Sequence, residues 1–223
     1  MSQQDNINNA QGTEEWKKSR LGKVTASKIN DVLAWTSRGE SVTRARYRAQ
    51  LANERITGEQ ISIPQNHHME RGVTFEPVAR KKYEARTGNV VKEVGFYDHP
   101  TIPMCGASPD GTVGNDGLIE IKCPTEINHL ATVVNAEVPP RYYGQIQWQL
   151  ACTNRLWCDF VSYSPDAPNH LALYVLRVHR DNIWIQETET EVLKFLAEVD
   201  LLTQNLIEVS NVHLKDENNE CIK

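Results

Sequence analysis

Apolar residues recur with two different spacings along the chain, and the two spacings predict where helices and strands lie. Recurrence every three or four residues predicts a helix, whereas alternation of apolar and polar residues predicts a strand. The helical spacing occurs in six segments, at residues 14–21, 23–34, 41–58, 69–88, 139–154 and 181–209. Strand patterns bounded by turn residues occur at residues 90–98, 106–124, 156–164 and 171–180. Helices before and after a block of strands predict an α/β (α+β) fold, with a central mixed β-sheet flanked by helices.

Glycine, proline and hydroxyl residues mark the ends of several of these segments. Gly58 and Gly88 directly follow helical patterns, at the position where glycine commonly ends a helix. Pro77 falls inside the fourth helical pattern, so we expect that helix to begin near Glu76 or to bend there. The second helical pattern has a candidate N-cap in either Thr25 or Ser27.

The length of 223 residues fits one folded unit, which we place at residues 13–223 as a single domain. Residues 1–12 are polar and lack periodicity, which predicts a flexible N-terminal tail. No apolar run reaches the ~20 residues that span a bilayer, and no leader pattern opens the chain, so we expect a cytoplasmic protein without membrane contact. The five cysteines include no C-x-x-C pair, which argues against a zinc site and favours reduced thiols.

The charge of the chain leaves nucleic-acid binding open. A net charge of −5 argues mildly against it, because nucleic-acid-binding proteins usually present a basic surface. The distribution of charge decides, however, and a group of active-site carboxylates would itself lower the total. Arg44, Arg46 and Arg48 either line a DNA path or form an ordinary solvated helix face, and the pattern does not distinguish the two.

Three charged residues interrupt the predicted hairpin at residues 106–124. Asp110 stands in a Pro-Asp-Gly turn, while Glu120 and Lys122 share one strand face opposite Ile119 and Ile121. Two neighbouring carboxylates repel each other unless a cation lies between them, and oxygen ligands suit Mg²⁺ or Mn²⁺. A lysine beside such a cation orients a water molecule or neutralises charge on a phosphate. The pattern alone leaves open a surface hairpin whose Glu-x-Lys pair is merely solvated.

Four ordered segments resemble the phage lambda exonuclease and YqaJ-like viral recombinase family of the PD-(D/E)xK nuclease superfamily. The core is "SPDG…LIEIKCP", at 108–124, which matches the P-D…(E)-x-K motif. The other three segments are "WKKSRLGKVTASKI" at 16–29, "RGVTFEPVAR" at 71–80 and "YYGQIQWQL" at 142–150. The resemblance implies a restriction-endonuclease-like core, whereas residues 36–66 and the C-terminal helices match only loosely.

The resemblance also implies a role for each residue of the core. Asp110 and Glu120 would ligate a metal ion together with the backbone carbonyl of Ile121. Glu76 would approach the same cluster from its helix and help to hold a second ion. Lys122 would position the attacking water.

Three further residues receive roles from the resemblance, and a fourth is a candidate on other grounds. Gln145 would orient the attacking water or the lysine. Arg20 and Ser27 would hold the 5′-phosphate of the strand being cut, a role for which a helix N-terminus with a nearby arginine is suited. Arg38, in the loop "TSRGE", is a candidate for contact with the DNA end on the basis of its position.

As a whole, the resemblance implies a Mg²⁺-dependent 5′→3′ exonuclease in which Mn²⁺ substitutes for Mg²⁺ and two ions occupy each site. Its substrate would be linear double-stranded DNA with 5′-phosphorylated ends. Mononucleotides would be released, and 3′ single-stranded tails would serve phage-type recombination by strand annealing. The implied partners are two further copies in a ring-shaped homotrimer and a single-strand annealing protein, in a bacterial host cell that carries a phage or prophage.

Two other functions are compatible with the same core motif. An endonuclease or resolvase would use the same carboxylates and lysine but would cut covalently closed circular DNA. A non-catalytic DNA-binding module would have a degenerate site, which the presence of Glu76, Asp110, Glu120 and Lys122 disfavours.

Overall fold

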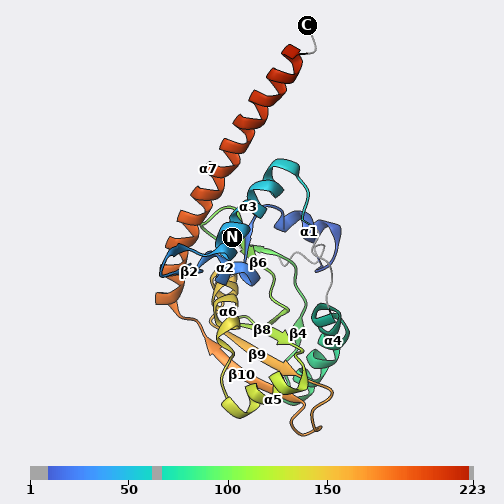
Figure 1. The fold of residues 1–223 in the computed structure, drawn as a ribbon. Helices are drawn as coiled ribbons and strands as arrows, with labels where there is room; N and C mark the ends of the chain where they lie inside the picture. The colour runs from blue at the N-terminus through green and yellow to red at the C-terminus, as the bar shows by residue number, and fades with distance from the viewer. Residues whose placement is uncertain (1–9, 62–66, 221–223) are drawn as a thin grey trace.

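A five-stranded mixed sheet forms the centre of the protein in a computed structural model, which describes residues 10–61 and 67–220, with side chains for 10–61 and 70–211 (Figure 1). Its strands are β4 (Val91–Lys92), β7 (Gly111–Val113), β8 (Gly117–Lys122), β9 (Trp157–Tyr163) and β10 (Leu173–His179). They lie in the order β10-β9-β8-β7-β4, and β8 and β9 are the parallel pair among them. The predicted mixed sheet and the hairpin turn at 114–117 are confirmed. Most of the predicted tail at residues 1–12 lies outside the described residues.

Helices α4 (His67–Thr87) and α6 (Pro140–Thr153) cover opposite faces of this sheet. Successive side chains of a strand point to opposite faces, so Ile119 and Ile121 pack against Ala79 and Tyr83 of α4. Leu118 points to the other face, where it packs with apolar residues of α6. Glu120 shares that second face. The strand therefore aims a carboxylate at α6 from the middle of the sheet.

A smaller three-stranded sheet lies beside the first, with β1 (Val24–Thr25), β6 (Cys105–Ala107) and β5 (Tyr97–Asp98) in that order. The prediction of one strand over residues 90–98 is wrong, because β4 pairs with β7 whereas β5 pairs with β6 of the other sheet. Gly106 permits this second pairing, since a Cβ atom there would lie 2.3 Å from the carbonyl oxygen of Tyr97.

The N-terminal region differs from its predicted two-helix arrangement. Helix α1 (Glu14–Arg20) forms as expected, but β1, a 3₁₀ turn η1 (Ala26–Lys28) and the short α2 (Ile29–Val32) replace the helix predicted over 23–34. Residues 24 and 25 are extended because they pair with β6, which buries both. Neither Thr25 nor Ser27 caps a helix through its side chain.

The remaining elements include two that the sequence pattern did not predict. These are a small hairpin of β2 (Trp35–Thr36) and β3 (Gly39–Glu40), and helix α5 (Glu126–Asn135). Helix α3 (Val42–Thr57) ends at Gly58, whose φ of 70° is left-handed as expected. Helix α4 starts well before Glu76 and contains Pro77, so the later start is wrong. Helix α7 (Asn182–Glu220) projects beyond the body (Figure 1), and no helix in the described ranges is long and apolar enough to cross a membrane.

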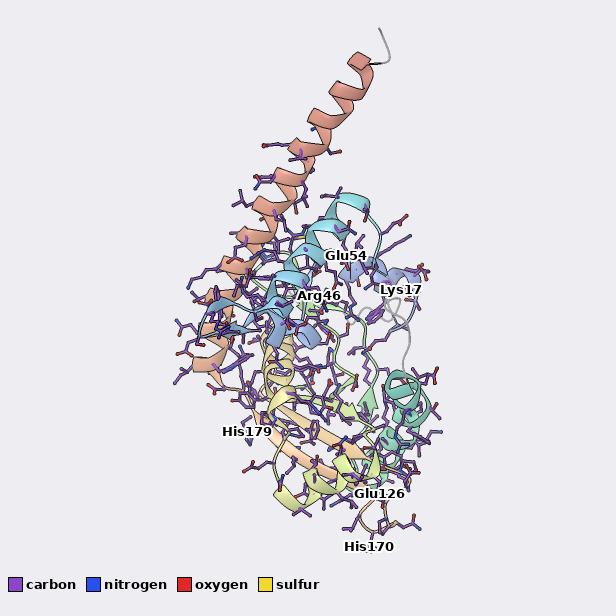
Figure 2. All side chains as sticks on the ribbon, in the orientation of Figure 1. Lys17, Arg46, Glu54, Glu126, His170 and His179 are labelled. Carbon is purple, nitrogen blue, oxygen red and sulfur yellow. The ribbon has the colours of Figure 1, made fainter. Side chains whose placement is uncertain are left out.

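Three of the four arginines on α3 join this helix to α7: Arg44 and Arg48 pair with Glu198, and Arg55 pairs with Asp200. The guanidinium of Arg44 is buried, donates two hydrogen bonds to Glu198 at 2.7 and 2.9 Å and also contacts Glu40 at 2.6 Å. Arg48 donates to the same two carboxylates. Arg46 is exposed on the outside of α3 (Figure 2). Arg44 and Arg48 therefore belong to an internal ion-pair network, and neither description that the pattern left open applies to them.

We predict that Arg44→Ala lowers the free energy of unfolding by about 2–4 kcal/mol, because removing one member of a buried ion pair strands the charges of its partners. Arg46→Ala removes the same charge from the same helix and should change the free energy of unfolding by less than about 0.5 kcal/mol. Urea unfolding followed by circular dichroism measures both. Equal effects of the two substitutions would contradict the structural role of Arg44.

Candidate active site

The β7–β8 hairpin brings Asp110 and Glu120 together. Gly111 pairs with Ile119 across the hairpin, so Asp110, which directly precedes β7, lies at the level of the next residue, Glu120. The backbone N–H of Ile121 donates a hydrogen bond of 2.7 Å to Oδ2 of Asp110. This bond holds the aspartate against the strand that carries the glutamate.

Glu120 is fully buried and accepts hydrogen bonds from three side chains. Lys122 Nζ lies 2.5 Å and Gln145 Nε2 lies 2.6 Å from its Oε1 atom. Gln149 Nε2 donates to its Oε2 atom at 2.6 Å. Both glutamines come from α6, so the helix that covers this face of the sheet also surrounds the carboxylate.

Burial shapes the protonation of the cluster. Burial raises the pKa of Asp110 well above its ordinary value, and the charge of Glu120 raises it further, while Lys122 opposes the change. Burial alone would lower the pKa of Lys122, but the carboxylates of Glu120 and Asp110 outweigh it and raise that pKa above the ordinary lysine value. Lys122 is therefore a cation at neutral pH, able to donate hydrogen bonds but not to accept a proton.

Glu76 approaches the cluster from α4 without a direct contact to the other carboxylates. Its Oε1 atom accepts a 2.6 Å hydrogen bond from Arg80, which also pairs with Glu93. Burial raises the pKa of Glu76, Arg80 lowers it, and Glu120 raises it again. Glu76 is thus within electrostatic range of Glu120 but is paired with an arginine.

The donor set suits a hard divalent cation. Within the described side chains, no three His, Cys, Asp or Glu residues come close enough to form a cation site by themselves. Asp110 and Glu120 are nevertheless adjacent carboxylates, and the charge of Glu120 adds to the effect of burial in raising the pKa of Asp110. Oxygen donors of this kind are those that Mg²⁺ and Mn²⁺ prefer, and the backbone carbonyl of Ile121 is an additional candidate. The residues present fit such an ion in their chemistry.

Arg20 and Ser27 line one cavity of about 1050 Å³ between α1, η1 and α3. The Arg20 guanidinium lies 4.1 Å from the centre of the Trp16 ring, and its Nε atom is buried without a hydrogen-bond partner among the described residues. Burial lowers the pKa of Arg20, an effect that Tyr47 and Glu54 oppose. The Ser27 hydroxyl is exposed to the cavity, 3.4 Å from that of Thr25.

The lining of this cavity is more basic than the chain as a whole. Five lysine and arginine side chains line it against three glutamates, although the net charge of the chain is −5. Figure 2 shows Lys17 and Glu54 on α1 and α3, the helices that border the cavity. The basic side chains are Lys17, Lys18, Arg20, Lys23 and Lys28.

Two hydrogen bonds connect α1 and the residues just before it to the segment that leads into Asp110. The Trp16 indole N–H donates to Oγ of Ser108 at 2.8 Å. The amide of Gln11 donates to the carbonyl oxygen of Pro109, also at 2.8 Å. Trp16 lines the cavity, so this side of the cavity is hydrogen-bonded to the segment that leads into the carboxylate cluster.

The structure places the predicted site residues in two groups and leaves one apart. Lys122 and Gln145 both contact Glu120, and Asp110 is hydrogen-bonded to the neighbouring Ile121. Arg20 and Ser27 share the cavity. Arg38 is exposed in the turn between β2 and β3 and does not line that cavity. Ser27 lies in a 3₁₀ turn followed by a four-residue helix, so the expected helix N-terminus is wrong.

Gln149 is a contact of Glu120 that the sequence analysis missed. It stands four residues after Gln145 in "GQIQWQL", a spacing that places two side chains on the same face of a helix. This spacing could have indicated that Gln149 lies beside Gln145 and therefore close to Glu120.

We predict that Asp110→Asn raises the melting temperature of the metal-free protein at neutral pH. Because the pKa of Asp110 is raised in the native state, this carboxyl group does not lower the stability at a pH below its pKa in the unfolded chain, near 3.9. The native state loses stability as the pH rises above that value and through the native pKa. Asparagine removes this loss and keeps an acceptor for the Ile121 N–H. The difference between variant and wild type should grow from pH 4 to pH 8 in EDTA, reaching a few degrees, since each kcal/mol is worth about 2–4 °C in a chain of this size. A lower melting temperature of the variant at pH 8 would contradict the unfavourable charge.

Solved structures of nucleases resemble this fold. An alkaline exonuclease, LHK-Exo from Laribacter hongkongensis, is 46% identical, with a TM-score of 0.82 over 89% of this chain and 98% of that chain. The same enzyme in complex with dAMP gives a TM-score of 0.83. A phage-related exonuclease from Haemophilus somnus 129PT is 13% identical, with a TM-score of 0.65 over 82% of this chain and 96% of that chain, and shows the fold alone.

Sequence comparisons give a family. The uncharacterized protein R354 of Acanthamoeba polyphaga mimivirus is 27% identical over 169 residues, which cover 70% of this chain but only 29% of that protein. The family model of the YqaJ-like viral recombinase domain matches residues 15–156, which include both the cavity residues and the carboxylate cluster. The chain has the PD-(D/E)xK fold of phage-related exonucleases and belongs to the YqaJ-like viral recombinase family.

Proposed function

We propose that this protein is a Mg²⁺-dependent 5′→3′ exonuclease of linear double-stranded DNA. It degrades one strand from a 5′-phosphorylated end to mononucleotides and leaves a 3′ single-stranded tail for recombination by strand annealing. One observation carries the proposal: Trp16, which lines the basic cavity with Arg20 and Ser27, is hydrogen-bonded to the segment that leads into the Asp110–Glu120–Lys122 cluster. The similarity to an alkaline exonuclease at 46% identity supports it.

The carboxylate cluster is the part of the site that would act on the scissile phosphate. Asp110, Glu120 and the carbonyl of Ile121 would hold Mg²⁺ or Mn²⁺, with Glu76 contributing to a second ion. The bound ions supply Lewis-acid stabilisation of the attacking and leaving oxygens in phosphodiester hydrolysis. Lys122, a partly exposed cation, would donate hydrogen bonds to the attacking water or to a phosphate oxygen.

Gln145 acts on the same water through its amide. It is half-buried, whereas Glu120 is fully buried, so its side chain reaches from the carboxylate toward the open side of the cluster. An amide both donates and accepts hydrogen bonds, which suits a group that orients a water or the Lys122 ammonium.

The cavity is the part of the site that would recognise the DNA end. A terminal phosphate in it would meet Arg20, whose buried Nε lacks a partner, and the exposed hydroxyl of Ser27. Charge-assisted hydrogen bonds of this kind are roughly twice as strong as neutral ones. Because Trp16 of the cavity is hydrogen-bonded to Ser108, an end bound there would lie on the side of the molecule that carries Asp110, which favours cleavage close to the terminus.

Other properties stay predictions that follow from the family. These are a ring-shaped homotrimer around the DNA and a single-strand annealing protein as partner. Arg38 as a contact for the DNA end, which rests on its position, and the cytoplasm of a bacterial host also stay predictions. An endonuclease or resolvase would use the same carboxylate cluster, but the end-binding cavity favours an enzyme that starts from DNA ends.

The proposed reaction is tested by digesting a labelled linear duplex that carries one 5′-phosphate end and one 5′-hydroxyl end, beside a covalently closed circle. With Mg²⁺ we expect mononucleotides from the phosphorylated end, and we expect none with EDTA. Lys122→Met should reduce the rate at least about 100-fold, because it removes the cation that stabilises developing charge, while the circular dichroism spectrum stays unchanged. Cutting of the circle would favour the endonuclease, and a fully active Lys122 variant would reject the site.

Arg20→Met should remove the preference for the phosphorylated end. The loss of a hydrogen bond to a charged group is worth about 1.5–3 kcal/mol, so the ratio of initial rates at the two ends should fall about 10–100-fold toward unity. Lys17→Met is the matched control, because it removes an exposed positive charge from the same helix and the same cavity. It should leave the ratio unchanged. An equal loss in both variants would indicate general electrostatic attraction in place of end recognition.

A further inference from the structure

Helix α6 carries three glutamines whose surroundings differ. Gln145 and Gln149 are separated by one helical turn and both donate to Glu120. Gln147 lies on another face, where its Nε2 donates to the carbonyl of His179 and its Oε1 accepts from the N–H of Asp181. Gln147 and Gln149 are both completely buried, whereas Gln145 is half-buried.

The three donors on Glu120 are distributed unevenly between its two oxygens. An ionised carboxylate offers about four acceptor positions, two on each oxygen. Lys122 and Gln145 both contact Oε1, whereas Gln149 alone contacts Oε2. The remaining acceptor position of Glu120 is therefore on Oε2, the oxygen whose direction Gln149 sets.

Among the described residues, the amide of Gln149 is hydrogen-bonded through its nitrogen but not through its oxygen. Its Oε1 atom is buried and has no hydrogen-bond partner among the described residues, in contrast to the fully bonded amide of Gln147. Buried polar atoms without partners are rare in proteins, because their desolvation is not repaid. A purely structural glutamine would be expected to satisfy both ends of its amide. The unpaired oxygen indicates that the contact with Glu120 determines where this side chain lies.

We infer that Gln149 is a positioning residue for Glu120. Its N–H fixes the plane of the carboxylate and leaves an acceptor position on Oε2 that a bound cation would use. A neutral donor is suited to this, because a lysine or arginine at the same place would compete with the cation for the charge of Glu120. The two glutamines therefore have different roles. Gln149 holds the Glu120 carboxylate from the buried side, and Gln145 is available to orient the attacking water at the open side. This inference rests on the proposed function and assigns a further residue to it.

The test compares Gln149→Met with Gln147→Met, two substitutions of equally buried glutamines on one helix. For Gln149→Met we expect kcat on a 5′-phosphorylated duplex to fall about 10–100-fold, the loss typical of residues that orient metal ligands. KM for DNA ends should stay within about twofold, because the end-binding cavity is untouched, and the Kd for Mn²⁺ from calorimetry without DNA should rise about tenfold. Gln147→Met should lower the melting temperature and leave kcat and the Kd for Mn²⁺ within about twofold.

The outcomes separate this inference from the proposed function. A wild-type protein that neither binds Mn²⁺ nor cuts DNA would reject the proposed function itself. An active wild type with a Gln149→Met variant of unchanged kcat and Mn²⁺ affinity would overturn the inference alone, as would equal losses of kcat in the two variants. If the methionine variant does not fold, Gln149→Asn supplies the same comparison, because asparagine keeps the amide but is one methylene shorter and does not reach Glu120.

Discussion

The burial of Glu120 is the constraint around which the rest of the site is built. A carboxylate in the middle of a sheet, with no exposed surface, is tolerated only where donors or cations compensate its charge. Here β8 supplies Lys122 two residues further along the same face, and α6 supplies two amides one turn apart. The helix is held in place by apolar contacts of Ile146 and Leu150 with the same sheet. Packing and charge compensation therefore depend on the same helix–sheet interface.

The division of the strands into two sheets places the second part of the site. Between β6 and β7 the chain leaves one sheet and enters the other, and Ser108, Pro109 and Asp110 lie at this transition. The same segment accepts hydrogen bonds from Trp16 and Gln11, which lie near the N-terminus of the chain. A residue pair far apart in sequence, Arg20 and Asp110, is thereby brought to neighbouring regions of the molecule. In the proposed function, recognition of a DNA end and hydrolysis near that end would both depend on this passage of the chain from one sheet to the other.

Local patterns predicted what local interactions determine, and failed where pairing between distant segments decides. Alternation in residues 118–122 correctly assigned Glu120 and Lys122 to one face, and Gly58 correctly ended a helix. The pattern around Thr25 predicted helix, but pairing with Cys105 and Gly106 makes this segment extended. Arg44 looked like a surface charge because its partner Glu198 is more than a hundred residues away. The contact of Gln149 was within reach of helical spacing, whereas the cavity around Arg20 required the tertiary structure.

The acidic total charge of the chain is compatible with binding of a DNA end because the relevant charges are local. At physiological ionic strength the screening length is about 8 Å, so a phosphate inside the cavity responds mainly to the groups that line it. The charged groups among them are five lysine and arginine side chains and three glutamates, while Asp110 and Glu120, which also add to the negative total, belong to the other cluster. A cation bound there would reverse the sign of that cluster toward a phosphate. The net charge of −5 therefore describes a protein whose two DNA-facing regions would both be positive once the metal is bound.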